Sequence, residues 1–192
     1  MAMWWALVVL PARALAVAPS AAGQEGIRAL MAKHDPILLY VSRLLRPAVS
    51  DDAGALYAWC RRLDELVDDP AANSDSLTTR ARLDEWRTRL DELWDGSPRD
   101  EMDAALLTTL QRNPSLGVQP FHDMLKGMRS DAVDSRCVAT SAELDEYAYQ
   151  VAGTVGLMLL PLLGVSEEEE AASLRRPAIA LGQAIQLINI LR

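Results

Sequence analysis

The sequence is poor in cysteine and phenylalanine, and it has no excess of positive charge. Its two cysteines, Cys60 and Cys137, lie far apart without CxxC spacing. This pattern indicates neither a disulfide scaffold nor a zinc site. The net charge is −8. We therefore do not expect nucleic acid as a partner, because proteins that bind its phosphates carry a basic face.

Long hydrophobic runs are also missing. The apolar N-terminal stretch MAMWWALVVLPARALAVAPSAAG is interrupted by Pro11, which leaves it too short to span a membrane. Residues 16–18 read Ala-Val-Ala, which resembles a signal-peptide cleavage site, but the first basic residue is Arg13. Residues 1–33 are therefore interpreted as a separate N-terminal segment, either a targeting sequence or an ill-defined start.

The sequence contains a helical pattern, divided by proline and glycine, and no strand alternation. The 192 residues favour one domain, and half of them are apolar. We predict helices over about 34–45, 52–68, 76–95, 100–112, 120–136, 143–164 and 177–192. Capping-box spacing occurs at Thr140 and Glu143, and again at Ser166 and Glu169. The last helix keeps an apolar period to the end of the chain, at Leu181, Ile185, Ile188 and Leu191. We therefore expect a fragment of a longer protein.

The segment YAWCRRLDELVDD, residues 57–69, carries the main candidate site. Tyr57, Arg61, Asp64 and Asp68 fall on one narrow strip of a helix. The neighbouring stripe is apolar and faces a core: Leu56, Cys60, Leu63 and Val67. Two carboxylates one turn apart suit Mg²⁺, which typically takes one or two carboxylates together with water and phosphate oxygens. Taken alone, the same spacing is more typical of a surface helix with weak ion pairs.

Four stretches in order resemble the squalene/phytoene synthase family, in its phytoene synthase branch. They are YAWCRRLDELVDDP, QPFHDMLKGMRSD, YAYQVAGTVGLMLLPLLG and ALGQAIQLINILR, and the resemblance covers residues 40–192. It implies an all-α, isoprenoid-synthase-like helical bundle over residues 34–192, truncated at its C-terminus. The family's second aspartate motif is expected directly after Arg192, so the fragment alone is expected to be inactive.

The resemblance also implies roles for individual residues. Asp64 and Asp68 match metal-binding aspartates, and Arg61 and Tyr57 match positions that hold diphosphate. Tyr147 matches a tyrosine facing the reacting carbons. Val151, Val155 and Gly156 match positions that line the isoprenoid channel. Gln186 and Asn189 match polar positions that lead into the second aspartate motif. Close packing of another helix is the alternative role for two glycines, equally favoured for Gly153 and less favoured for Gly156. His34 and His122 are isolated and expected at the surface.

One stretch departs from the family pattern. Upstream of SRLL the family carries a Ser-Lys-(Ser/Thr)-Phe-like segment that helps to bind diphosphate, whereas this chain has KHDPILLYV. We therefore predict no site residue before Tyr57.

The implied reaction is head-to-head condensation of two geranylgeranyl diphosphates to phytoene through a cyclopropyl diphosphate. The implied cofactor is Mg²⁺, with Mn²⁺ as an alternative, and no NADPH is expected. A squalene synthase-type enzyme and a non-catalytic assembly protein are the alternatives. Peripheral membrane association is expected for release of an apolar product. The expected location is the plastid in a photosynthetic eukaryote, and otherwise the cytoplasm or a membrane surface.

Overall fold

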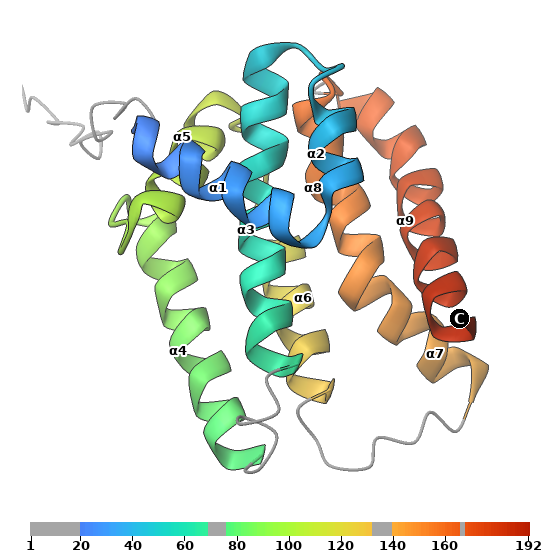
Figure 1. The fold of residues 1–192 in the computed structure, drawn as a ribbon. Helices are drawn as coiled ribbons and strands as arrows, with labels where there is room; N and C mark the ends of the chain where they lie inside the picture. Colours follow the sequence, from blue (N-terminus) through green and yellow to red (C-terminus); the bar gives the residue numbers. More distant parts are fainter. Residues whose placement is uncertain (1–19, 69–75, 132–139, 166–167) are drawn as a thin grey trace, which may run out of the picture.

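Helices form all the regular structure among the described residues, which are 20–68, 76–131, 140–165 and 168–192 of a computed structural model. Figure 1 shows α1 (Ala21–His34), α2 (Pro36–Ser42), α3 (Pro47–Asp68), α4 (Ser76–Trp94), α5 (Glu101–Arg112), α6 (Gln119–Asp131), α7 (Ser141–Ala148), the π-helical turn η1 (Tyr149–Gly153), α8 (Thr154–Leu162) and α9 (Glu168–Leu191). The predicted all-α class is confirmed for these residues.

Helix α3 is the centre of the bundle and packs against α1, α4, α5, α6 and α8. In Figure 1 α1 crosses in front of it, and α4 and α8 flank it. The predicted apolar stripe is confirmed, since Leu56, Leu63 and Val67 are buried and Cys60 packs against the core. The neighbouring side of α3 is left for polar side chains.

The single phenylalanine of the chain lies where three helices meet. Phe121 of α6 is fully buried, and Trp59 of α3 and Trp94 of α4 each meet its ring edge to face, with centroids 4.8 and 5.1 Å away. Such aromatic pairs contribute about 1 kcal/mol each beyond the area they bury. This cluster fixes the spacing of α3, α4 and α6.

The first predicted helix differs from the structure. Asp35 leaves helical geometry at φ −139° and ψ 64°, and it separates α1 from α2. Pro36 is the reason, because proline disfavours the helical conformation in the residue before it. Helix α1 was not predicted and lies upstream of the predicted range, with the Ser20 hydroxyl accepting the Gly23 N–H at its start. Residues 1–19 lie outside the described part, so their targeting role stays a prediction.

The two C-terminal helices also differ in detail. The predicted helix 143–164 is interrupted by η1, and its Thr140 cap is confirmed by a 3.2 Å bond from the Glu143 N–H. Pro177 lies inside α9 rather than at its start. The Glu-, Ala- and Arg-rich turns before Pro177 favour helix strongly enough to outweigh the hydrogen bond that proline removes. The second capping box includes Ser166, which lies outside the described residues.

Glycines allow α9 to pack directly on η1 and α8. A Cβ on Gly182 would lie 2.3 Å from the Ala152 carbonyl oxygen, and one on Gly156 would lie 2.4 Å from the Ala178 carbonyl oxygen. Both obstacles are backbone atoms, which cannot move aside as a side chain can. Helix α9 therefore packs backbone to backbone against η1 and α8.

Large apolar side chains remain exposed on two helices. The predicted period of α9 is present, but Leu181, Ile185, Ile188 and Leu191 are 51–86% exposed. The helices and turn that contact α9, namely α7, η1 and α8, therefore pack on its other side. Ile37 and Leu44, in and just after α2, are similarly open. None of the described helices is both long and apolar enough to cross a membrane.

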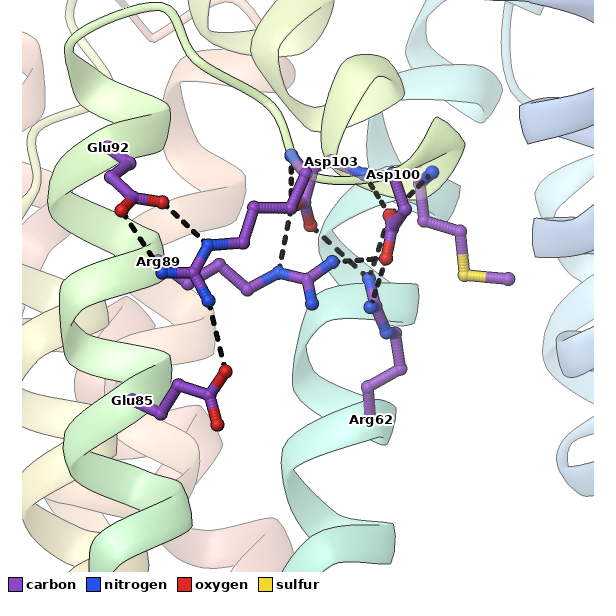
Figure 2. Close-up of polar contacts among 8 residues, drawn as sticks. Arg62, Glu85, Arg89, Glu92, Asp100 and Asp103 are labelled. Atoms are coloured by element: carbon purple, nitrogen blue, oxygen red, sulfur yellow. Dashed lines mark hydrogen bonds and ion pairs between the residues drawn. The ribbon is translucent and has the colours of Figure 1, made fainter.

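A charged cluster joins α3, α4 and α5 (Figure 2). Asp103 of α5 is 2% exposed, and its carboxylate lies 2.7 Å from Arg89 Nε and 3.3 Å from Arg62 Nη1. It also accepts the Arg99 N–H at 3.1 Å. The guanidinium groups of Arg62 and Arg89 each lie 4.8 Å from the centre of the Trp86 ring. One buried carboxylate therefore has two cations, and both cations also contact an aromatic ring.

Asp100 completes this cluster at the start of α5. Its carboxylate caps the helix by accepting the N–H groups of Met102 and Asp103 at 3.0 and 2.9 Å, and it pairs with Arg62 and Arg89. Burial alone raises the pKa of Asp100, but the Asp103 N–H and the two guanidinium groups outweigh it and hold the pKa below its usual range. Asp100 therefore stays ionised at neutral pH.

We expect Asp103→Ala to lower the free energy of unfolding by about 3 kcal/mol, because it leaves two partly buried arginines without their shared carboxylate. Urea denaturation followed by circular dichroism measures this change. The matched control is Glu92→Ala, which removes an exposed partner of Arg99 and should change the midpoint little. Equal losses in the two variants would contradict a special role for Asp103.

Gly182→Ala should lower the free energy of unfolding by about 2 kcal/mol, because the added methyl group overpacks the contact between α9 and η1. Thermal denaturation monitors the loss. Gly117→Ala serves as control, since a Cβ there would meet no atom within 4 Å. A Gly182 variant as stable as the Gly117 variant would show that the helices separate easily.

Candidate functional site

The predicted polar strip lies along one side of α3. Tyr57, Arg61 and Asp64 are half-buried on it, and Asp68 is exposed as the last residue of the helix. The charges of Arg61 and Asp64 both act on the Tyr57 hydroxyl. The helix thus keeps the first three side chains together, while residues 69–75 beyond Asp68 lie outside the described part.

Tyr57 is held from the junction between α1 and α2. Its hydroxyl donates a hydrogen bond to the Asp35 carboxylate. Burial raises the pKa of Tyr57 above its usual range, and the hydrogen bond and negative charge of Asp35 raise it further. The phenol therefore stays protonated at neutral pH, and its ring is fixed against α3.

Arg61 has a weakly satisfied guanidinium group. Its Nε lies 3.9 Å from Oε1 of Glu65, which is one turn further along α3. That Nε atom is buried and has no hydrogen-bond partner among the described residues. A buried donor without a partner is costly, so this atom favours an incoming acceptor such as a phosphate oxygen.

His34 contacts the same carboxylate from the end of α1. Its Nε2 lies 2.7 Å from Glu65 Oε1, although the pair is not aligned as a hydrogen bond. The imidazole is only 17% exposed. The expectation that both histidines lie at the surface is therefore wrong, since His122 is also half-buried and lies 3.5 Å from Asp91. Each ring packs beside a carboxylate.

Cys60 lies beside the strip but is not part of it. Burial raises the pKa of its thiol above the usual range, and the negative charge of Asp64 raises it further. The group therefore stays a neutral thiol and acts as a packing residue, as predicted. Cys137 lies outside the described residues.

Tyr147 is half-buried at the end of α7. Its neighbour Tyr149 begins η1 and donates a 2.7 Å hydrogen bond to Asp123 of α6. Burial and this bond raise the pKa of Tyr149 to about 12. Asp123 also accepts a 2.8 Å bond from Gln119. The Tyr149–Asp123 contact fixes η1 against α6 and thereby sets the position of Tyr147.

The three predicted channel residues have different surroundings. Val151 of η1 faces α6, with its Cγ1 3.0 Å from where a Cβ on Gly127 would lie. Val155 of α8 is half-buried against the core. Gly156 faces the α9 backbone at Ala178, which gives it the packing role that the sequence left open. A channel-lining role for these residues stays a prediction.

Gln186 and Asn189 lie on α9, apart from the strip on α3. Gln186 is half-buried and Asn189 is exposed. Helix α8 packs against both α3 and α9, and Figure 1 shows it between them. The structure therefore places the two predicted polar sets on helices that share α8 as a neighbour.

The described residues contain no group of three or more His, Cys, Asp or Glu side chains arranged to hold a metal ion. The predicted site has two carboxylates, Asp64 and Asp68. Two carboxylates are within the range that Mg²⁺ uses when water and phosphate complete its shell. The donor set therefore fits Mg²⁺ bound together with a diphosphate.

The surface also has two grooves beside α4. One, of about 590 Å³, lies between α4 and α6 and includes Arg87, His122 and Lys126 in its wall. The other, of about 450 Å³, lies between α3 and α4 and includes Glu65 and Trp86. Neither is lined by any of the ten residues predicted for the site, so we do not assign them to it.

Sequence reasoning missed His34 and Asp35, which the structure brings to Tyr57 and Glu65. The pair precedes Pro36, and a proline that follows polar residues marks a helix boundary. That signal places His34 and Asp35 at a junction between helices. It does not show which side of α3 the junction meets.

Comparison with known proteins agrees with this geometry. The chain is 50% identical over 140 residues to phytoene synthase 1, chloroplastic, of Zea mays, covering 72% of this chain and 33% of that protein. It is 41% identical over 196 residues to 15-cis-phytoene synthase of Synechococcus elongatus, covering 97% of this chain and 62% of that protein. The chain thus spans between a third and three fifths of the length of these relatives.

Solved structures share the helical fold. A dehydrosqualene synthase superposes with a TM-score of 0.74 at 33% identity, over 88% of this chain and 56% of that one. A squalene synthase from Alicyclobacillus acidocaldarius gives the same TM-score at 26% identity, over 88% of this chain and 60% of that one. The predicted isoprenoid-synthase-like bundle is confirmed. The family described as Squalene/phytoene synthase matches residues 31–192, and the chain belongs to that family.

Proposed function

We propose that this chain is part of a prenyltransferase of the phytoene synthase type, which joins two geranylgeranyl diphosphates head to head. The observation that carries the proposal is the strip Tyr57–Arg61–Asp64–Asp68 on α3 of a chain whose relatives are named phytoene synthases. The strip combines a cation, an aromatic hydroxyl and two carboxylates at one edge of the bundle. This is the chemistry that a diphosphate with its metal requires.

Arg61 would bind the diphosphate directly. Its buried Nε without a hydrogen-bond partner among the described residues supports this role. A guanidinium group donates in a planar fork that matches phosphate oxygens. Charge stabilisation of this kind strengthens as the carbon–oxygen bond breaks and negative charge collects on the leaving diphosphate.

Tyr57 would line the same region as a protonated phenol. Its hydroxyl hydrogen is engaged by Asp35, so towards substrate the oxygen offers a lone pair and the ring offers an aromatic edge. We infer that Tyr57 shapes and positions the site.

Asp64 and Asp68 would hold Mg²⁺, with Mn²⁺ as an alternative. When bound, the ion supplies charge neutralisation for the departing diphosphate. Asp64 is half-buried one turn from Arg61. Asp68 is the last residue of α3 and is exposed to solvent. The carboxylates set where the ion lies relative to the guanidinium group.

The prenyl chains need an apolar wall that excludes water from the allylic cation. Val151 and Val155 supply such side chains, and Gly156 lets α9 close the wall behind them. The ring of Tyr147 would stabilise the cation by about 1–2 kcal/mol through cation–π attraction. The cyclopropyl diphosphate then loses its diphosphate, and rearrangement of the resulting cation followed by loss of a proton yields phytoene without a reductant.

Gln186 and Asn189 would extend the polar end of the site from α9. Both lie in the last turns of that helix, and the second aspartate motif is expected beyond them. Their proposed role is to orient the second diphosphate.

A squalene synthase-type reaction is the second candidate, because solved structures that superpose well on this fold are named dehydrosqualene and squalene synthases. The first candidate is favoured by 41–50% identity to proteins named phytoene synthases. Product analysis with and without NADPH separates the two, since reduction to squalene requires the cofactor.

The surroundings of the proposed enzyme follow from its chemistry. Its prenyl diphosphate substrate is charged and its product is an apolar hydrocarbon, which favours work at a membrane surface. Plant relatives are named chloroplastic, so we propose a plastid location if the chain comes from a photosynthetic eukaryote. If the source has no plastid, we propose that the protein is located in the cytoplasm or at a membrane surface.

We expect Asp64→Asn and Asp68→Asn, each in the full-length protein, to lower the rate of phytoene formation by at least about a thousandfold, because each removes a negative ligand oxygen from the metal. The measurement is conversion of radiolabelled geranylgeranyl diphosphate at saturating Mg²⁺. The circular dichroism spectrum should be unchanged.

Asp84→Asn is the matched control, since Asp84 of α4 is exposed and pairs with Arg129 on the outside of the bundle. It should retain normal turnover. Normal turnover in either Asp64 or Asp68 variant would refute the assigned metal site. Absence of any product from the wild type would favour the non-catalytic assembly protein.

A further inference from the structure

We propose that His34 is a positioning residue that holds the Glu65 carboxylate away from Arg61 and so keeps the Arg61 guanidinium open to diphosphate. The inference rests on the proposed function and names a part of that site upstream of Tyr57. It concerns three side chains at the meeting of α1 and α3: His34, Arg61 and Glu65.

The starting point is an expected but loose ion pair. Arg61 and Glu65 are four residues apart on α3, the spacing at which an arginine and a glutamate normally pair on a helix. Their closest atoms are nevertheless 3.9 Å apart, at the limit of an ion pair, and Arg61 Nε stays without a hydrogen bond among the described residues. The contact with Arg61 alone therefore does not fix the position of Glu65.

His34 is the side chain in position to do so. Its Nε2 is 2.7 Å from Glu65 Oε1, the same oxygen that lies 3.9 Å from Arg61. The imidazole is therefore nearer to this carboxylate than the Arg61 guanidinium is, although the pair is not aligned as a hydrogen bond. Glu65 is 37% exposed and retains freedom to turn towards either partner. The position of His34 therefore decides how strongly Glu65 competes for Arg61.

The fold fixes His34 in this place. Met31 and Ile27, one and two turns earlier on α1, are buried in the core and hold that helix against α3. The Asp35 N–H bonds the Met31 carbonyl at 2.8 Å and ends α1 directly after His34. Asp35 then accepts the Tyr57 hydroxyl, about two turns of α3 before Glu65. The junction between α1 and α2 thus contacts α3 at two positions, Tyr57 and Glu65.

Without His34, Glu65 is free to turn to Arg61 and neutralise it. A diphosphate would then have to displace the carboxylate before binding, so its affinity falls. The step after binding is unchanged, because Arg61 reaches the same final position. The expected signature is a higher KM with little change in kcat, and not a loss of fold.

A double-mutant cycle tests the inference on the full-length protein, with inorganic pyrophosphate and Mg²⁺ as the probe in calorimetry. His34→Leu keeps the volume of the side chain and removes its contact to Glu65. We expect it to raise the pyrophosphate Kd about tenfold. In the Glu65→Gln background the same substitution should have no effect, because the Glu65 carboxylate is no longer present to compete for Arg61.

Two further variants complete the experiment. His34→Gln keeps a side-chain N–H and should bind pyrophosphate within about twofold of the wild type. His122→Leu is the matched control, a half-buried histidine beside a carboxylate on another face, and should leave the Kd unchanged.

The outcomes are distinct. An unchanged Kd in His34→Leu overturns the inference, and so does an equal loss in the presence and absence of the Glu65 carboxylate, which would indicate a packing effect only. Failure of the wild type to bind pyrophosphate would instead overturn the proposed function, and this inference with it.

Discussion

The position of α3 depends on one buried carboxylate, that of Asp103. It lies between Arg62 of α3 and Arg89 of α4, and both guanidinium groups also contact the Trp86 ring (Figure 2). A buried charge is stable only when it is fully paired, so this cluster tolerates little rotation of α3. Arg61 and Arg62 differ by about 100° around the helix axis. Fixing Arg62 against α5 therefore directs Arg61 to another side, where the candidate site lies.

The same helix serves the core and the site at once. Its apolar stripe packs beneath α1, α5 and α6, and Trp59 joins the edge-to-face cluster around Phe121. Its polar strip meets the α1–α2 junction, where Asp35 binds Tyr57 and His34 contacts Glu65. The charge that would be expensive in a fully buried helix is accommodated because α3 is buried on some sides only. Packing and chemistry thus use different faces of one element.

Close packing also fixes the helices on the other side of the bundle. Gly156 and Gly182 let α9 approach η1 and α8 at backbone distance. The Tyr149–Asp123 bond joins η1 to α6, which in turn packs against α3. Helices that carry predicted substrate residues are therefore connected to α3 through direct contacts and not through loops. Such a scaffold suits a reaction that requires two large substrates in fixed orientation.

The sequence by itself determined the helical class, the bounds of α4 and α5, and the grouping of Tyr57, Arg61 and Asp64 on one strip. These features follow from the helical period and from proline and glycine, which act within a few residues along the chain. Only the tertiary structure decided that Arg62 anchors α3, that Gly156 faces α9, and that His34 and Asp35 belong beside the strip. It also decided that the apolar period of α9 is exposed in the described chain. Each of these outcomes depends on which helix packs against the residue concerned. The local sequence pattern does not specify that neighbouring helix.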